Sequence, residues 1–475
     1  MIMRRALIAF LVVLLLISVG FLSVHGLLLE IADDVTVTQQ TLFGDPTAAS
    51  GVEVLVRNHY DQHLLWETTL KLEEVPVLKT DFTFQNAPII IPKDPAYPGL
   101  EFTSVRDAFF FTGNRISEAV ASKYKPLLDA LKDMEASVPK GEKKSFQINF
   151  ADYLDYYPLE GQVILGEWST VFSEFQHWTN DSEEIAAAIN QFFRIPIQGR
   201  YVIDYEIDKT NNGSSYGAYI EIDNYPTAHG VATENACYFT FNTVLKDGNV
   251  FDTSLIPGGY GIYCLPYEGD QLKLNDLKMV FSLDPTVSYA DMYLSQDGKR
   301  LRLHTWEGDD LMLTVIDIAT MKQVQKVKLL TRQEGWAYRW NCYDDFTMIQ
   351  EHASDTNVQD RITVWEENKD NTWSHVFTVD MDLSIISEGK KSNLFDSYRN
   401  AVDYQDGKLV LIAHQVIRHE PYWYRDYCDI IMVVFDQTGM CYAGTYHWNL
   451  TDVNSLEPNE TRIHPTTDSA LEVSW

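Results

Sequence analysis

The sequence predicts an all-β fold, a β-propeller of about seven blades with short helical insertions, preceded by a single N-terminal transmembrane helix. Three observations predict it. A charge-free apolar run opens the chain, short β-rich runs separated by turn residues dominate from Val52 onward, and a four-strand repeat recurs over residues 286–449. Together they place one membrane-spanning helix before a chain built of antiparallel sheets.

The apolar run extends from Ala6 to Val24 and is preceded by Arg4 and Arg5. About 19 residues at about 1.5 Å each match the roughly 30 Å hydrocarbon core of a bilayer. A signal peptide usually has a shorter apolar region, of about 7–15 residues, and small residues at the cleavage positions. We therefore expect an uncleaved anchor, with secretion after signal-peptide cleavage as the alternative. The two arginines place the N-terminus in the cytoplasm and the rest of the chain outside it.

The domain order expected from these signals has five parts. They are a short cytoplasmic N-terminus (1–5), the transmembrane anchor (6–26), a membrane-proximal linker (27–51), an extracytoplasmic propeller-like domain (52–450) and a C-terminal tail (451–475). Inside the linker, residues 35–38 alternate as a short strand does. Helical spacing over about 117–137 and 181–194 predicts two helices inserted between strands. Pro126 is expected to kink or divide the first of them.

Charge and cysteine content exclude several classes of protein. The net charge of −31, from 37 basic and 68 acidic residues, repels phosphate backbones and anionic lipid head groups, so nucleic acid is not an expected partner. Five scattered cysteines are too few for a disulfide scaffold and form no metal-binding CxxC pair, although one or two bridges are permitted. We expect no cofactor and no metal. The expected partners are the membrane, through the N-terminal helix, and a protein or glycan at the cell surface.

The repeat has three units, which begin near Tyr293, Tyr343 and Val402. Each contains four short β-rich runs, and the first and third open with a hairpin turn of the Asp-Gly type, which supplies the positive φ angles that a tight turn needs. In the first unit Leu301 and Leu303 alternate with arginines, so one face is apolar. A four-stranded sheet cannot cover both of its faces alone, and stacking of copies around an axis into a propeller is the expected solution.

The first unit also resembles a known family. Its segment from Ser295 to Val327, "SQDGKRLRL…LTVIDIATMKQVQKV", is similar to a blade of the YVTN-type or quinoprotein-type propellers, which are WD-repeat-like. Met321 stands where that family usually has Gly, and the other two units match more loosely. The resemblance covers residues 286–449 and implies a propeller without implying a reaction. Residues 52–285 would supply about four more blades, or alternatively a mixed α/β module at about 52–200 before a smaller β domain.

Candidate ligand- or partner-binding residues gather in the loop between the second and third strands of the last unit. Aromatic side chains on a loop offer large, rigid contact area at low entropic cost, which suits stacking on sugars or contact with a protein. The alternative is that the loop folds back and caps its own sheet. The candidates are His419, Tyr422, Trp423, Tyr424 and Arg425.

Two further patterns are weaker. His304, His352 and His414 each fall near the end of a unit's second strand, but stacked sheets lie about 10 Å apart and metal ligands about 2 Å from the metal. We therefore expect hydrogen bonding at the sheet edge and no shared metal site. Asp152 and Asp155 lie among tyrosines, as carboxylates do in glycosidase clefts, although such a pair also arises by chance in an acidic chain.

The sequence therefore predicts a membrane-anchored binding, scaffold or sensor module that is not an enzyme and has no catalytic residues. The alternative is a cell-surface carbohydrate-active hydrolase or lyase that uses carboxylates in the propeller channel. Fold alone does not choose between them, because propellers host unrelated functions.

Overall fold

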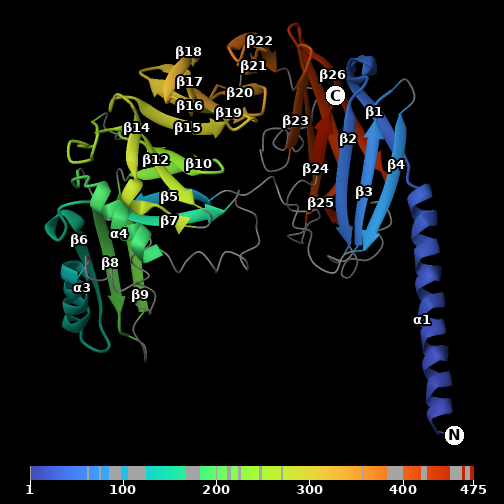
Figure 1. The fold of residues 1–475 in the computed structure, drawn as a ribbon, viewed down its shortest axis with the longest axis horizontal. Helices are drawn as coiled ribbons and strands as arrows, with labels where there is room; N and C mark the ends of the chain where they lie inside the picture. Colours follow the sequence, from blue (N-terminus) through green and yellow to red (C-terminus); the bar gives the residue numbers. More distant parts are fainter. Residues whose placement is uncertain are drawn as a thin grey trace. The chain divides into compact units, whose positions relative to one another are not determined.

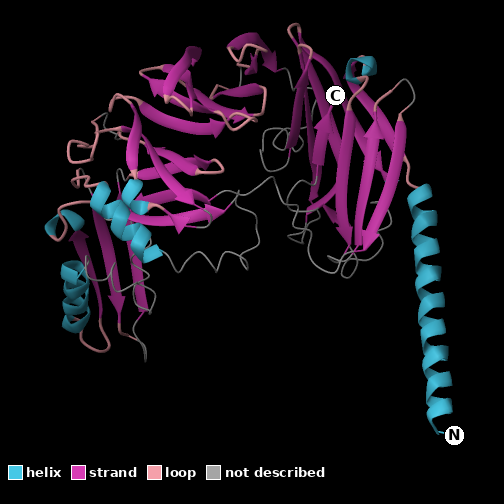
Figure 2. Cartoon of the chain, viewed as in Figure 1, coloured by secondary structure: helices cyan, strands magenta, loops and turns pink. Residues whose placement is uncertain are grey.

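A computed structural model describes most of the chain, and most of its regular structure is antiparallel strand (Figure 2). The residues outside the described part are 1, 61–63, 74–75, 85–97, 105–124, 158, 166–181, 199–200, 211–214, 223–225, 245–248, 269–270, 356–357, 382–399, 419–424, 450–462 and 466–470. The chain forms two compact units. Unit 1 comprises Met1–Ile91, Gly335–Asn368 and Ser374–Trp475, and unit 2 comprises Pro92–Glu334 and Lys369–Trp373.

The apolar N-terminal run forms a long helix, α1, which spans Ile2–Asp33 (Figure 1). It contains an apolar segment of 24 residues, Phe10–Asp33, long enough to cross a membrane, a property shared by membrane anchors and signal sequences. The helix continues beyond the expected anchor because Leu28 and Ala32 are buried in a hydrophobic cluster of unit 1. Its last turns therefore belong to the core of unit 1.

The last repeat unit of unit 1 contains a fifth strand from the start of the chain. β1 follows α1 and pairs with β26 in antiparallel register, from Val37 opposite Trp448 to Gly44 opposite Tyr442. The segment expected as a linker thus supplies an edge strand. The sheet order is β1-β26-β25-β24-β23, with bounds Val37–Gly44, Gly439–Trp448, Arg425–Asp436, Lys408–Arg418 and Asn400–Gln405.

The C-terminal segment expected as a tail completes the first sheet in the same way. β2 pairs with β3 on one side and with two short C-terminal strands on the other. This sheet comprises β2 to β4 at Glu53–Tyr60, Leu64–Lys71 and Val77–Phe84, with β27 and β28 at Ile463–Pro465 and Leu471–Ser474. The short helix η1, Pro46–Ala49, joins β1 to β2. The third sheet of unit 1 is β19 to β22, at Trp336–Cys342, Phe346–Ala353, Asp360–Glu367 and Trp373–Met381.

The described residues of unit 2 form three sheets. One is β15 to β18, at Ser288–Leu294, Arg300–Glu307, Asp310–Asp317 and Lys322–Thr331. Another joins β5, β7, β10, β11, β12, β13 and β14, at Pro98–Ser104, Leu159–Leu165, Thr227–Ala232, Ala236–Phe241, Gly261–Glu268, Gln271–Leu272 and Lys278–Ser282. The third joins β6 (Lys143–Asn149), β8 (Tyr201–Asp208) and β9 (Ser215–Ile222). The described helices of the unit are α3 (Lys125–Ser137), η2 (Phe150–Asp152), α4 (Ser182–Phe192) and η5 (Leu274–Asp276).

The predicted repeat is confirmed, because each of its three units forms four consecutive antiparallel strands. The turns follow the expected chemistry. Gly298 and Gly407 have φ angles of 65° and 80°, and Asp406 before Gly407 has 51°. Met321 also has a positive φ, 50°, which accounts for the glycine preferred at that position by the family that the unit resembles.

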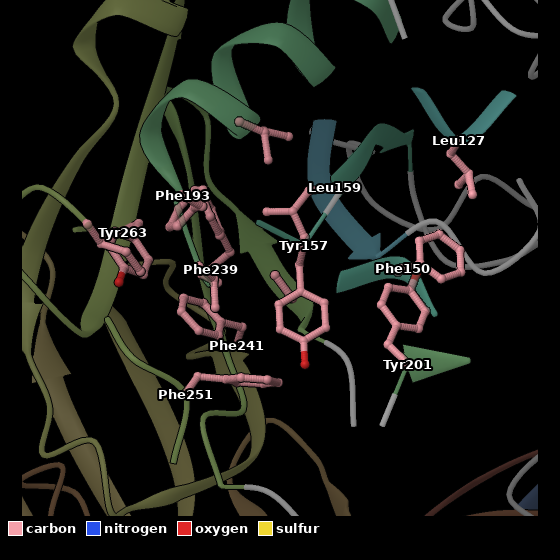
Figure 3. Packing of buried hydrophobic residues seen from close by; sticks show 14 of the residues in the cluster. Leu127, Phe150, Tyr157, Leu159, Phe193, Tyr201, Phe239, Phe241, Phe251 and Tyr263 are labelled. Atoms are coloured by element: carbon pink, nitrogen blue, oxygen red, sulfur yellow. The ribbon is translucent and has the colours of Figure 1, made fainter. Parts of the chain in front are cut away.

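The described part of residues 52–285 contains sheets of different kinds. β2 to β4 form an antiparallel sheet with two C-terminal strands, whereas in unit 2 helices share a hydrophobic core with the strands. Leu127 of α3 and Ile189 of α4 are buried in one cluster with Tyr201 of β8 and Phe239 of β11. Figure 3 shows the aromatic part of this cluster around Tyr157. The two helices are thus core elements of a mixed α/β region.

The first of these helices is described only from Lys125 onward, because residues 117–124 of the predicted range lie outside the described part. Pro126 lies in the first described turn of α3, and its expected effect on the helix stays a prediction. The helix predicted over 181–194 is confirmed as α4. A closed ring and a count of about seven blades stay predictions.

Asp406 offers a test of the turn geometry. Its side chain is exposed and its φ is positive, a conformation that Asp and Asn tolerate but β-branched residues do not. We expect Asp406→Val to lower the free energy of unfolding by about 1–2 kcal/mol, whereas Asp406→Asn leaves it nearly unchanged. Chemical denaturation of both variants measures the difference, and equal stabilities would contradict the assigned turn.

Candidate functional site

The loop predicted to bind a ligand or partner lies outside the described residues. His419, Tyr422, Trp423 and Tyr424 belong to it. Arg425 is the first residue of β25, but its side chain is not among those described. The role of this loop stays a prediction.

The three histidines do not share one environment. His304 is fully buried on β16, an inner strand of its sheet, so the expectation of a role at the sheet edge is wrong for it. Burial, followed by the charge of Arg302, lowers the pKa of His304 to about 3. His352 Nδ1 lies 2.9 Å from Asp360 Oδ2, and the side chain of His414 is not described. Within the described residues, no group of three or more His, Cys, Asp or Glu side chains could hold a metal.

The pair of aspartates considered from the sequence lies at the surface. Asp152 and Asp155 are both exposed. The neighbouring Tyr157 is buried and its hydroxyl donates to the carbonyl oxygen of Gln198 at 2.5 Å. The aromatic residues around the aspartates therefore serve the core, and no described cavity contains the two carboxylates.

A polar cavity of about 390 Å³ lies in unit 2 between two of its sheets. One wall is a face of β16, β17 and β18, and the other is the end of β14 with the turn that follows it. The lining residues are Phe281, Ser282, Leu283, Asp284, Thr286, Val287, Thr305, Glu307, Gly308, Thr314, Gln323 and Lys326. This volume is within the roughly 300–1,000 Å³ typical of small-molecule sites.

Strand register places the polar lining on one face. Thr314 of β17 lies opposite Leu303 of β16 and opposite Lys326 of β18. Thr305 and Glu307 follow Leu303 at alternate positions, so all three point to the same side of β16. The first part of that side is apolar, because Leu303 belongs to the hydrophobic cluster between these sheets. The cavity therefore begins where this face changes from leucine to polar residues.

Opposite charges meet in the cavity. Lys326 Nζ lies 2.5 Å from Glu307 Oε1, and both side chains remain about one-third exposed, at 35% and 31%. Asp284 supplies a second carboxylate, whose Oδ1 accepts hydrogen bonds from the N–H and hydroxyl of Thr286, at 2.9 and 2.8 Å. These hydrogen bonds, the backbone one first, hold the pKa of Asp284 below its usual value. Asp284 is accordingly ionised at neutral pH.

A buried hydroxyl also lines the cavity. Thr305 is 1% exposed, and its Oγ1 has no hydrogen-bond partner among the described residues. Leaving such a group unpaired costs about 1–3 kcal/mol, so it calls for an explanation. The cavity thus offers two carboxylates, one ammonium group and hydroxyls, which together suit a hydroxylated, charged ligand.

The sequence carries a signal for this site, although none of the candidate residues above belongs to it. Leu301 and Leu303 established which positions of β16 face the core, and the same alternation assigns Thr305 and Glu307 to that face. Polar residues at consecutive core-facing positions indicate either a cavity or a buried network. The lysine was not recognisable, because its position depends on the bulges between β17 and β18.

No known protein family matches the chain, and no curated protein matches it. Among solved structures, it is similar to a putative 6-phosphogluconolactonase from Bacteroides fragilis, with 9% identity, a TM-score of 0.28 and coverage of 84% of this chain and 95% of that one. The chain is also similar to TolB from Acinetobacter baumannii, with 9% identity, a TM-score of 0.23 and coverage of 88% of this chain and 81% of that one. A third similar structure is an oligogalacturonate lyase in complex with manganese, with 9% identity, a TM-score of 0.23 and coverage of 52% of this chain and 54% of that one.

These similar structures are propeller-like proteins, and the chain shares with them a mostly β architecture of antiparallel sheets. Several of them are named as enzymes, including the lactonase and the lyase above and a periplasmic gluconolactonase from Pseudomonas aeruginosa. These findings contradict the expectation of a non-catalytic binding module. The enzymatic alternative agrees with them better, although at these scores no activity is carried over from any of these proteins.

The unpaired hydroxyl gives a prediction of stability. Replacing Thr305 by Val removes a buried polar group that has no partner, so we expect Thr305→Val to raise the free energy of unfolding by about 1 kcal/mol. Thr240 is the matched control, because it is equally buried but its Oγ1 donates to the carbonyl oxygen of Gly261 at 2.9 Å. Thr240→Val should lower stability by about 1 kcal/mol. Chemical denaturation that shows losses of the same size in both variants would refute the assignment.

The buried histidine gives a prediction of pH dependence. The folded-state pKa of His304 is about 3 and the unfolded value about 6.5, so between these values the unfolded chain binds a proton that the folded one does not. Stability contributed by the neutral side chain is thus lost as pH falls below about 6.5. We expect His304→Gln to lose less stability than the parent between neutral pH and about pH 4. Parallel curves of unfolding free energy against pH would show that His304 does not titrate in this way.

Proposed function

We propose that this protein is a membrane-anchored, extracytoplasmic carbohydrate-active enzyme, and that the polar cavity between β14 and β16–β18 binds its substrate. The supporting observation is the content of that cavity: the Glu307–Lys326 pair, the ionised Asp284 and the unpaired hydroxyl of Thr305 line one space. A channel through the centre of a propeller is not needed for this proposal.

Of the two reaction types considered, cleavage of an acidic glycan by β-elimination agrees better with these charges. Elimination needs a base and a cation near the substrate's carboxylate. Glu307 takes the proton from the carbon beside the uronate carboxyl, and Lys326 binds that carboxyl. The electron pair of the broken C–H bond forms a C=C bond, the glycosidic C–O bond breaks, and water protonates the leaving oxygen.

Hydrolysis is the second candidate, because Asp284 and Glu307 supply the two carboxylates that it requires. Its general acid must carry a proton, which usually demands a raised pKa. The pKa of Asp284 is lowered, so Asp284 would have to be the nucleophile or base and Glu307 the acid. Hydrolysis gives Lys326, the ion-pair partner of Glu307, no role, whereas elimination uses it to bind the carboxylate of the substrate, so hydrolysis is the second choice.

The membrane location is a further part of the proposal. Arg4 and Arg5 before the apolar run favour an N-terminus in the cytoplasm, and both units then lie on the other side. Retention of α1 is supported by its continuity, because the helix that contains the apolar run extends without a break to Leu28 and Ala32, which are buried in the core of unit 1. An extracytoplasmic position is also where polysaccharide substrates are found.

The proposal is tested with full-length protein in detergent and a panel of uronate-containing and neutral polysaccharides. Elimination yields unsaturated products that absorb in the ultraviolet together with new reducing ends, whereas hydrolysis yields reducing ends alone. We expect unsaturated products from an acidic glycan and a loss of at least about 100-fold in rate for Glu307→Gln.

The control variant is Glu206→Gln, because Glu206 forms a comparable ion pair with Lys143, at 2.7 Å, elsewhere in unit 2. It should keep the parental rate. Absence of products from every polysaccharide, or full activity of the Glu307 variant, would refute the proposed site.

A further inference from the structure

The C-terminal half of helix α1 lies beside the edge strand β4 of unit 1 (Figure 1). Aromatic side chains of the two elements are in contact. The ring of Phe21 lies 6.0 Å from that of Phe84, and the ring of His25 lies 5.3 Å from that of Phe82. From the first contact to the second, the residue number increases in the helix, from Phe21 to His25, and decreases in the strand, from Phe84 to Phe82. The two elements therefore run in opposite directions. Phe84, at the end of β4, is therefore the residue of this pair nearest the N-terminal part of α1.

The apolar run fixes the depth of this contact. If Ala6–Val24 spans the hydrocarbon core, Phe21 lies inside it, three residues and about 4.5 Å from its outer end. Phe84 is level with Phe21 because their rings are neighbours. The end of β4 accordingly reaches the outer boundary of the hydrocarbon core.

The side chains at that level suit a membrane interface. Phe84 is 47% exposed and Phe21 is 59% exposed, although both are large and apolar. Phe82, one step further from the bilayer, packs on Trp66 with ring centroids 5.6 Å apart. Transfer of such exposed apolar rings from water into the hydrocarbon of a bilayer is favourable. Phe21 of α1 and Phe84 of the sheet thus present neighbouring apolar side chains at the same level.

The helix cannot swing away freely from the sheet. Leu28 and Ala32 are buried in the core, and Asn449 fixes the turn after the helix. The Asn449 side chain donates to the carbonyl oxygen of Asp34 at 3.0 Å and accepts from the N–H of Thr36 at 2.7 Å. Unit 1 is therefore held at a fixed height on its anchor.

We propose that the end of β4 is a second membrane contact, in which Phe84 inserts into the outer leaflet beside α1, so that unit 1 rests directly on the lipid surface. The occupant is a zwitterionic bilayer, because a chain with net charge −31 is repelled by anionic head groups. This inference rests on the retention of α1 as an anchor. It is independent of the reaction assigned to unit 2.

A photoreactive phenylalanine analogue tests the contact in the full-length protein. It replaces Phe84, Phe10 or Phe43 in separate variants reconstituted into phosphatidylcholine vesicles, and lipid adducts are detected by mass after illumination. Phe10 lies in the apolar helix, and Phe43 is the matched control, because it is 43% exposed near the end of β1, which leads away from α1. We expect adducts at positions 84 and 10 and several-fold fewer at 43.

Adducts at position 10 without adducts at 84 would overturn the second contact while leaving the anchor intact. Equal yields of lipid adducts at positions 84 and 43 would overturn it as well, because position 84 would then be no closer to the bilayer than position 43. An intact mass that lacks α1, or no adduct at position 10, would refute the anchor itself and with it this inference. None of these outcomes depends on enzymatic activity.

Discussion

The backbone pairing of β1 with β26 is the constraint on which the arrangement of unit 1 depends. It joins the residues directly after the apolar helix to a strand near the other end of the chain, with Val37 opposite Trp448, so these residues complete the last repeat unit. The C-terminus makes the reciprocal connection, since β27 and β28 complete the sheet of β2. With both ends of the chain built into sheets, α1 leaves unit 1 from a fixed point, and its last turns become part of the core.

A second constraint shapes unit 2, where sheets and helices cover one another's apolar faces. The face of β16 that carries Leu301 and Leu303 is covered by the neighbouring sheet, and the same face becomes polar at Thr305. A cavity arises there because polar side chains cannot fill the interface without partners. The fold thus places a cavity lined by charged side chains at the end of an apolar interface between two sheets. The proposed chemistry uses these charged side chains.

The sequence predicted the elements that depend on local chemistry. The apolar run became α1, the Asp-Gly turns took positive φ, and the three repeat units formed four strands each. Met321 shows the limit of the resemblance, since the backbone keeps the left-handed conformation even though the glycine that usually accompanies it is absent. Local signals of this kind are readable because each depends on a few adjacent residues.

Features that depend on distant pairing were not predictable. Residues 37–44 alternate like any short strand, and nothing in them specifies β26 as their partner. For the region around Tyr157 both blades and a mixed α/β module were open, because its β-strands have the same alternation whether a sheet or a helix covers them. The site was missed for a related reason: Glu307 and Lys326 meet only through the register of β16, β17 and β18.

Hydrogen exchange of the full-length protein tests the central claim most directly, namely that the segment after the apolar helix is a strand of the last repeat unit. The account predicts that the amides of residues 37–44 engaged in the ladder with β26 are protected to the same degree as those of β25 and β26. Exchange of the whole segment at the rate of an unstructured peptide would contradict it, because α1 would then be joined to the sheets by a loose linker.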